Sequence, residues 1–303
     1  MRFEDSERGG GHVFILGPAR SGTSLLFKAL CLHPQAAWIS NWMIRAPGLP
    51  QLAVLNRISR RLPDQCRRCW FDDRGNAYVY GTRRPLRRRL LPMPAEGEPV
   101  FRHCGMSGSD EAEPDLDRLR RTIAAIRHAA GGQVFVNKRI ANNRRVPLLA
   151  AALPDAKFVF LCRDGRAVAY SLAQVDWWPD DVVWWYGGTP RQWAAEGGDP
   201  WEICARNWVE ELRAAERGLA AVPDTQRLDL RYEDLIRDPV RTLEKIAEFA
   251  GLAATGTWLE DLTRLRYPDR NERWRSALPP HTIARISGIQ HAELVRHGYL
   301  EES

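Results

Sequence analysis

The chain has 303 residues, of which 44% are hydrophobic and 27% are charged, as in an ordinary soluble globular protein. No run of 18 apolar residues occurs, so no membrane-spanning helix is expected. The formal net charge is +6, and forty of the 44 basic residues are arginines, whose guanidinium groups grip anionic ligands through paired hydrogen bonds. Because the basic residues are spread and do not alternate with aromatic residues, we do not expect a nucleic acid as the ligand.

The N-terminus and the cysteines predict a single domain in a reducing compartment. Residues 1–11 are polar and glycine-rich, unlike a secretory signal, and are expected to form a disordered lead before one domain at residues 12–303. Six cysteines are few for this length, and Cys162 lies within an apolar run. We therefore expect free thiols and a cytoplasmic protein.

Two of the cysteines are spaced as in zinc sites. Cys66 and Cys69 form a C-x2-C pair, and His103 and Cys104 follow later in the chain. A structural zinc site usually combines two spaced pairs, and adjacent histidine and cysteine residues have poor geometry for the second half. No metal is therefore expected.

The hydrophobic pattern predicts an α/β fold. Strands are predicted at residues 13–16, 133–137, 157–162 and 227–230, of which the first and third are apolar runs. Helical patterns occur at residues 24–32, 115–130, 144–152, 163–173, 202–219 and 239–250. Strands that alternate with helices predict a parallel sheet flanked by helices. Residues 41–110 contain seven prolines and are expected to form an irregular insertion or lid, and residues 176–200 a tryptophan-rich loop.

A glycine-rich turn joins the first predicted strand to its helix. The spacing Gly17-x4-Gly22 matches the phosphate loop of nucleotide hydrolases, in which backbone N–H groups and a helix N-terminus bind a phosphate. Thr23 stands where that loop has its lysine, and Arg20 supplies a cation from within the loop. The loop therefore predicts a site for phosphate or sulfate, with a donor different from that of the hydrolases.

Each of the other predicted strands also ends at basic residues. Lys138 follows the second strand, Arg163 the third, and Arg231 and Tyr232 the fourth. Since parallel sheets bind their ligands at the carboxyl ends of the strands, these residues are expected to converge on one polyanion.

In this order, the segments resemble the sulfotransferase family that uses 3′-phosphoadenosine 5′-phosphosulfate (PAPS), and most of all its branch of tyrosylprotein and carbohydrate sulfotransferases, in a bacterial form. The family's loop P-R-S-G-T-[ST]-L is similar to residues 18–25, with Ala19 as one extra residue. The other similar segments are NK at 137–138, RDGRAVAYS at 163–171, RYEDL at 231–235 and RW at 273–274.

The resemblance implies a role for each matched residue. The 5′-phosphosulfate of PAPS would be bound by the loop residues Arg20, Ser21, Gly22, Thr23 and Ser24. The 3′-phosphate would be bound by Arg163 and Ser171, with Tyr232 and Arg273 at the same donor, and Lys138 would contact the sulfuryl group or the bridging oxygen. The resemblance thus implies transfer of a sulfuryl group to a hydroxyl or amine, with adenosine 3′,5′-bisphosphate (PAP) as product and no metal.

The general base that deprotonates the acceptor is not defined by the resemblance. Tyrosylprotein sulfotransferases have a glutamate beyond the loop, at a position that falls on Asn41 here, and an amide cannot act as a base. The candidates are His103, Glu111 and Glu113. His103 is favoured because imidazole titrates near neutral pH and because residues 100–101 are expected to form a strand toward the site.

Two other functions remain open. A small-molecule kinase could share the loop, but Thr23 replaces the lysine that such an enzyme needs. A non-catalytic binder of adenosine bisphosphate would keep the phosphate sites and lack a base. The acceptor is expected to be a small molecule or a saccharide, and the sequence does not indicate an oligomeric state.

Overall fold

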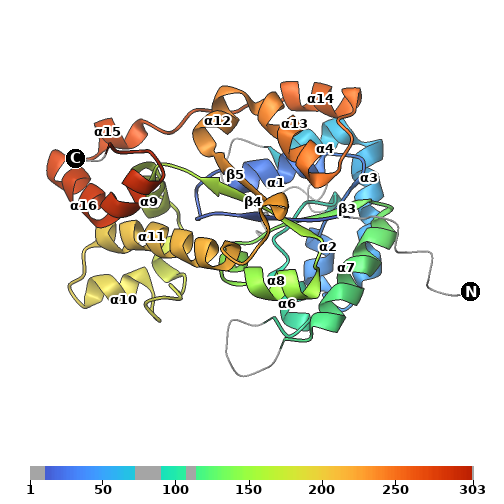
Figure 1. The fold of residues 1–303 in the computed structure, drawn as a ribbon, viewed down its shortest axis with the longest axis horizontal. Helices are drawn as coiled ribbons and strands as arrows, with labels where there is room; N and C mark the ends of the chain where they lie inside the picture. The colour runs from blue at the N-terminus through green and yellow to red at the C-terminus, as the bar shows by residue number, and fades with distance from the viewer. Residues whose placement is uncertain (1–10, 72–89, 107–113, 302–303) are drawn as a thin grey trace, which may run out of the picture.

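Five parallel strands form the central sheet (Figure 1). The computed structural model describes residues 11–71, 90–106 and 114–301. The strands are β1 (His12–Leu16), β2 (Ala36–Ala37), β3 (Val134–Lys138), β4 (Ala156–Cys162) and β5 (Arg227–Arg231), in the order β2-β3-β1-β4-β5. The predicted α/β fold with a parallel sheet is confirmed. The sequence did not predict β2, because two alanines carry no strand pattern.

The register of the strands places their carboxyl ends together. All five residues of β1 are buried, and β1 pairs with β3 on one side and β4 on the other. Ile15 lies opposite Lys138, and Leu16 lies opposite Phe160. The residues that follow these three strands therefore meet at one edge of the sheet.

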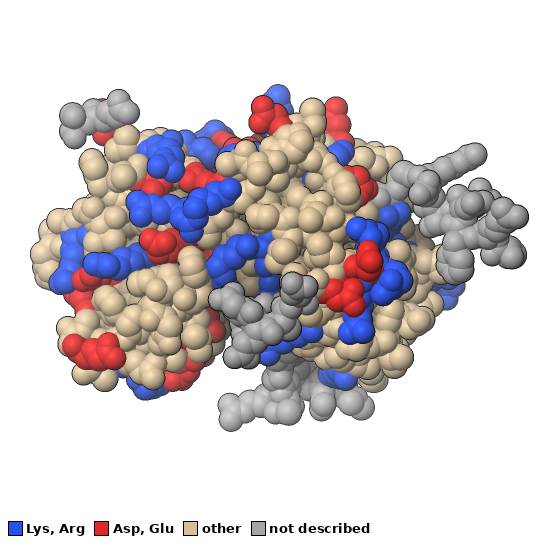
Figure 2. Space-filling model, turned by 60° about the horizontal axis from the view of Figure 1, so that its bottom comes forward, with Lys and Arg blue, Asp and Glu red and all other residues tan. Residues whose placement is uncertain are grey.

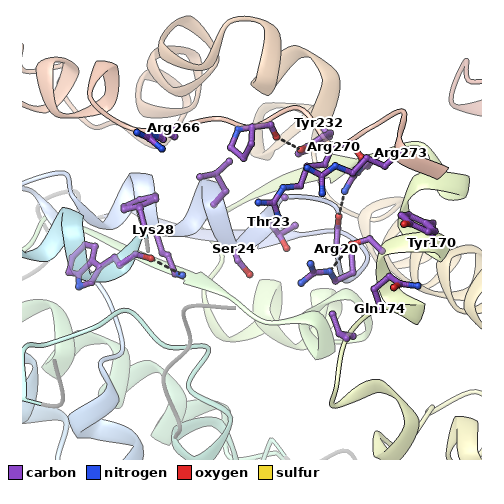
Figure 3. Close-up of a pocket in the computed structure, with 18 residues that line it drawn as sticks. Arg20, Thr23, Ser24, Lys28, Tyr170, Gln174, Tyr232, Arg266, Arg270 and Arg273 are labelled. Atoms are coloured by element: carbon purple, nitrogen blue, oxygen red, sulfur yellow. Dashed lines mark hydrogen bonds between the residues drawn. The ribbon is translucent and has the colours of Figure 1, made fainter. Parts of the chain in front are cut away.

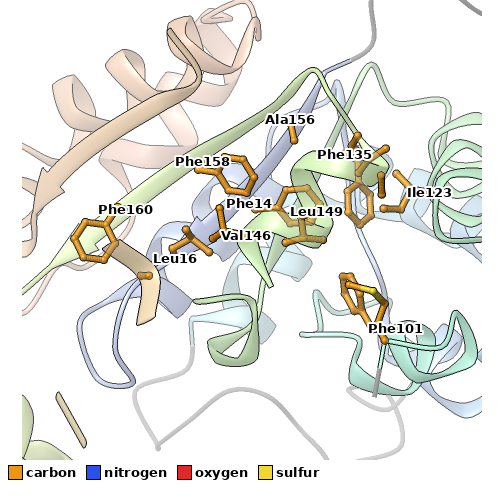
Figure 4. Close-up of a cluster of buried hydrophobic side chains, with 14 of the residues drawn as sticks. Phe14, Leu16, Phe101, Ile123, Phe135, Val146, Leu149, Ala156, Phe158 and Phe160 are labelled. Atoms are coloured by element: carbon orange, nitrogen blue, oxygen red, sulfur yellow. The ribbon is translucent and has the colours of Figure 1, made fainter. Parts of the chain in front are cut away.

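One face of the sheet packs against α7 (Leu116–Ala130), α8 (Val146–Ala152) and α11 (Pro200–Leu219) (Figure 1). Phenylalanine rings from three strands form the centre of this layer (Figure 4). The ring centroid of Phe14 lies 5.9 Å from that of Phe158 and 6.1 Å from that of Phe135. Since each fully buried phenylalanine contributes about 1.5–3 kcal/mol, this layer is a main source of stability.

The opposite face packs against α1 (Thr23–Cys31), α13 (Pro239–Ala250) and α14 (Gly256–Thr263). The Trp258 indole N–H of α14 donates to the carbonyl of Ala29 in α1 at 3.0 Å, which ties the two helices together. A third buried cluster combines residues of α11 with α9 (Gly165–Ala173), α15 (Arg273–Ala277) and α16 (Pro280–Arg296). Two hydrophobic clusters thus cover the two faces of the sheet, and a third lies among α9, α11, α15 and α16.

The expectation of an irregular segment at residues 41–110 is wrong for its described parts. These contain α2 (Asn41–Arg45), η2 (Pro50–Leu55), α3 (Asn56–Arg61), α4 (Pro63–Trp70) and α6 (Glu98–His103). Pro50, Pro63 and Pro99 lie in the first turns of their helices, where a missing N–H costs nothing. The strand expected at residues 100–101 is also wrong, because both residues lie in α6.

The tryptophan-rich segment is more ordered than the expected loop. It contains η4 (Trp178–Asp180) and α10 (Pro190–Ala195), and its rings pack against one another and on α11. The Trp184 indole N–H donates to Glu211 at 2.8 Å, and Trp177 is 40% exposed. The remaining elements are η3 (Ile140–Arg144), η5 (Asp224–Gln226) and α12 (Tyr232–Arg237). Within the described stretches, no helix has both the length and the apolar character needed to cross a membrane.

Candidate active site

The loop between β1 and α1 has a backbone that only certain residues tolerate. Gly17 and Gly22 have φ angles of 134° and 87°. A Cβ on Gly22 would lie 2.6 Å from the ring of Tyr232, so the position needs glycine for space as well as for conformation. Arg20, with φ of 69°, is the one residue other than glycine in the described stretches with a positive φ. This left-handed conformation costs about 1 kcal/mol, which the contacts of the loop must offset.

Asn143 anchors the start of the loop. Its Oδ1 accepts from the Gly17 N–H at 2.9 Å, and its Nδ2 donates to the Gly17 carbonyl at 3.2 Å. The same Nδ2 donates to Glu211 of α11 at 2.7 Å. Burial raises the pKa of Glu211, although the nearby Arg144 and the donated hydrogen bonds oppose that shift. These polar contacts fix the loop against α11, and no sequence pattern indicated them.

Arg163, directly after β4, joins the loop to a segment near the C-terminus. Its guanidinium donates to the carbonyl of Arg20 at 2.8 Å, to the carbonyl of Arg270 at 2.9 Å and to Asn271 Oδ1 at 3.0 Å. The group also lies over the ring of Tyr232, at 4.3 Å from the centroid. The residue that was expected to bind one phosphate therefore also holds the walls of the site together.

Arg20 of the loop and Ser171 of α9 are in direct contact. The Arg20 Nε donates to Ser171 Oγ of α9 at 3.0 Å. Burial lowers the pKa of Arg20, and the positive charges of Arg163 and Arg270 lower it further. Guanidinium groups this close repel one another, so a bound polyanion would relieve the repulsion.

These groups border a cavity of about 560 Å³ above the loop (Figure 3). The predicted site residues that line it are Arg20, Gly22, Thr23, Ser24, Arg163, Ser171, Tyr232 and Arg273. Ser21 is fully buried and is not among the lining residues. On the surface view, lysine and arginine side chains gather along the middle of one face, with acidic side chains between them (Figure 2).

Several other residues line the cavity that no motif in the sequence had indicated. Lys28, Trp70 and Phe71 are lining residues, and Lys28 Nζ donates to the Trp70 carbonyl at 3.1 Å. Arg266 and Arg270 also line the cavity, Arg270 near Arg273 and Arg266 on the side of Lys28 (Figure 3). The density of arginines at residues 266–275 was a signal that could have found these two. No motif marked Trp70, whose side chain is fully buried and whose carbonyl accepts from Lys28 of α1.

Lys138 lies outside the lining of this cavity and forms an ion pair. It is the last residue of β3, is 4% exposed, and its Nζ lies 2.6 Å from Glu96 Oε1. The other carboxylate oxygen of Glu96 accepts from Arg139 at 2.9 Å. Burial alone would raise the pKa of Glu96, but the charges and hydrogen bonds of Lys138 and Arg139 outweigh it and lower the pKa.

The structure does not bring His103 into the cavity. His103 is exposed at the end of α6, where its ring faces Gly48, and Arg118 donates to its carbonyl at 3.1 Å. Glu111 and Glu113 lie outside the described residues.

The four residues considered for zinc are not gathered into one site. Cys66 and Cys69 belong to the hydrophobic cluster on the α1 face of the sheet, whereas Cys104 belongs to the cluster on the α11 face. Burial raises the pKa of the Cys66 thiol to about 12, so the thiol is protonated at neutral pH. All six cysteines are buried and free.

The segment that carries the phosphate loop, Arg20 and Arg163 matches a known protein family. Residues 12–256 match the sequence model of the sulfotransferase family, so the chain belongs to that family. Carbohydrate sulfotransferase 5 of Mus musculus is 26% identical, covering 95% of this chain and 80% of its own length. The protein is therefore a sulfotransferase, an enzyme that transfers sulfuryl groups.

Solved structures agree on the fold. Sulfotransferase STF9 from Mycobacterium avium matches with a TM-score of 0.56 and 16% identity, over 96% of this chain and 77% of its own. Sulfotransferase STF1 from Mycobacterium tuberculosis H37Rv matches with a TM-score of 0.54 and 17% identity, over 93% and 76%. At this level of identity the likeness concerns the fold, which is the sulfotransferase fold with a phosphate loop.

Proposed function

We propose that the protein transfers the sulfuryl group of PAPS to a hydroxyl of a saccharide, without a metal. The contact between Arg20 and Ser171 carries the proposal, because it joins two anion-binding elements at one cavity. The phosphate loop suits the 5′-phosphosulfate, and Arg163 with Ser171 suits a second phosphate, which PAPS has on its 3′-oxygen and ATP lacks. Phe71, a half-buried residue of the cavity lining, offers aromatic surface to a purine.

The side chains present suit an in-line transfer. Charge develops on the departing 5′-phosphate, where Arg20 and the N–H groups at the start of α1 would stabilise it. No side chain caps the N-terminus of α1, which supports an anion at that position. Lys138 would act at the sulfuryl group or the bridging oxygen. A sulfuryl group carries less negative charge than a terminal phosphoryl group, so arginine and lysine suffice in place of a metal.

We also propose that the acceptor is a saccharide and that the protein is cytoplasmic. The relatives from Mus musculus and Danio rerio are both carbohydrate sulfotransferases, at 26% and 21% identity. The buried, free cysteines suit a reducing compartment.

Calorimetry with PAP and with ATP, both without Mg²⁺, tests the donor. We expect micromolar or tighter binding of PAP and much weaker binding of ATP. Arg163→Ala should weaken PAP binding by about 2–4 kcal/mol, the scale for the loss of a charge-assisted partner of a buried anion. Arg206→Ala, on the exposed side of α11, is the matched control and should bind PAP as the native protein does. Equal binding of PAP and ATP would contradict the assignment and favour the kinase.

Transfer of labelled sulfate from PAPS to a panel of neutral saccharides, amino sugars, phenols and peptides tests the acceptor. Labelled saccharides support the proposal, and label found only on phenols or peptides contradicts it. Tight PAP binding with no release of sulfate from PAPS would indicate the non-catalytic binder.

A further inference from the structure

The position where a general base was expected holds another segment in place. Asn41 Oδ1 accepts from the Met93 N–H at 2.9 Å, and the Asn41 N–H donates to the Met93 carbonyl at 3.0 Å. Ser40 and Pro94 form an antiparallel bridge, and the Ala95 N–H donates to the Ile39 carbonyl at 2.8 Å. Residues 39–41, which follow β2, are thus hydrogen-bonded to residues 93–95. The next residue of that second segment is Glu96.

Glu96 is fixed at the carboxyl end of β3. Asn137 Nδ2 donates to the Glu96 carbonyl at 3.1 Å, which ties the backbone of Glu96 to the strand. The side chain is 14% exposed and receives Lys138 at 2.6 Å and Arg139 at 2.9 Å. The segment held by Asn41 therefore supplies a carboxylate at the side chain of Lys138.

Neither Lys138 nor Glu96 lines the cavity, but Lys138 lies opposite Ile15 near the carboxyl end of β1, beside the start of the phosphate loop. If Lys138 contacts the sulfuryl group during transfer, the acceptor oxygen that attacks the sulfur must lie near the Lys138 ammonium. A general base must reach the proton of that oxygen, and the carboxylate bound to the same ammonium is placed to do so. His103, by contrast, is exposed beside Gly48.

We infer that Glu96 is the general base of this sulfotransferase and that Asn41 positions its segment. The inference rests on the proposed role of Lys138 at the PAPS sulfuryl group. In the step, the acceptor oxygen forms a bond to sulfur, and the bond from sulfur to the 5′-phosphate oxygen breaks. The electron pair of that bond stays on PAP, and the acceptor proton passes to Glu96.

The basicity of Glu96 depends on the donor. In the structure the carboxylate is ionised, because Lys138 and Arg139 hold its charge. When Lys138 contacts PAPS, the carboxylate shares the ammonium with the donor and becomes a stronger base. Arg139 and Asp181 are the other charged groups whose fields act at this carboxylate.

The test compares two reactions that differ in their need for a base. Transfer from PAPS to a sugar hydroxyl or to water requires proton removal. The exchange of sulfate from p-nitrophenyl sulfate to PAP releases a phenolate that needs no proton. Glu96→Gln should lower transfer to hydroxyls and to water by about 100-fold or more, remove the acid limb of their pH–rate profile, and change the exchange and PAP binding little. Lys138→Ala should lower both reactions, because it acts on the sulfuryl group itself.

Glu98→Gln is the matched control for the loss of a buried ion pair. Glu98 belongs to the same segment and pairs with Arg145 at 2.9 Å, and its variant should keep both reactions if it folds. An equal loss of both reactions in Glu96→Gln would show a structural role, and full transfer to hydroxyls would show that another group is the base. Loss of transfer in His103→Ala or Asp181→Asn, with Glu96→Gln active, would also overturn the inference. A native protein that neither hydrolyses PAPS nor catalyses the exchange would instead contradict the proposed donor.

Discussion

Arg20 shows how one residue of the loop combines strain with charge. Its backbone is left-handed, its carbonyl accepts from Arg163, and its guanidinium donates to Ser171. Strained backbone of this kind persists where the surroundings hold it, and it is common at functional sites. Here the hydrogen bonds that hold the strain come from the residues proposed to bind the donor, so forming the loop also forms the site.

His33, at the end of α1, makes stability depend on pH. It is 1% exposed, its Nε2 donates to the Ala253 carbonyl at 2.7 Å, and its Nδ1 accepts from the Gln35 N–H at 3.1 Å. The neutral ring satisfies both contacts, and burial lowers the pKa of His33 from 6.5. The folded state therefore binds fewer protons than the unfolded state, and the contribution of His33 is full above pH 6.5 and is lost as the pH falls below it.

Urea unfolding at pH 7 and pH 5 measures this effect. We expect the free energy of unfolding to fall on acidification, and to fall less in His33→Gln, which cannot be protonated. His12 contributes in the same direction, because burial lowers its pKa as well, so some loss remains in the variant. His291→Gln, at an exposed site of α16, should retain the native pH dependence. If the free energy of unfolding falls as much in His33→Gln as in the native protein, His33 does not cause the pH dependence.

At the scale of elements, the hydrophobic pattern of the sequence predicted the strands of the sheet better than the helices of residues 41–110. The runs that became β1 and β4 are continuous and apolar, because burial on both faces selects such runs in a parallel sheet, whereas β5 at the edge of the sheet is only partly buried. The prolines of residues 41–110 led to the wrong expectation of an irregular segment. Proline disrupts the interior of a helix, but it is favourable in the first turn. The helices of this segment pack with α1 and α7, and those tertiary contacts have no signature in a single sequence.

The junction of β1 and α1 gives a prediction about glycine. In Gly22→Ala, the new methyl group would displace the Tyr232 ring, and Arg163 stacks on that ring. We expect a loss of stability of more than about 1 kcal/mol from the strained backbone, and clearly weaker PAP binding. Thermal unfolding and calorimetry measure the two effects.

Gly288→Ala is the control for this substitution. Gly288 lies in α16 with open space around it, so alanine should stabilise the helix by about 0.5–1 kcal/mol and leave PAP binding unchanged. Tight PAP binding by Gly22→Ala would show that the loop adapts to a side chain at this position.

At the scale of the whole molecule, topology explains why much of the candidate site could be predicted. A parallel sheet brings Gly17, Lys138 and Arg163 to one edge although the sequence separates them widely, so knowing the strands was enough to group them. Glu96 and Asn143 could not be found this way. Their positions depend on pairing between irregular segments and on hydrogen bonds between buried polar groups, which follow no periodic pattern.

The cavity is bordered by the loop after β1, by α1 and α9, and by the segment at residues 266–273, so a ligand bound there contacts segments from both ends of the chain. PAP at about 100 times its Kd should stabilise the folded state by about 2.7 kcal/mol, which for 303 residues raises Tm by about 4 °C. We predict one cooperative transition in calorimetry, shifted as a whole by PAP, because residues 12–303 are proposed to form a single domain. Arg163→Ala should unfold in one transition that PAP at the same concentration shifts less. Two transitions, with only one sensitive to PAP, would show that the chain divides into separate domains and that the cavity belongs to one of them.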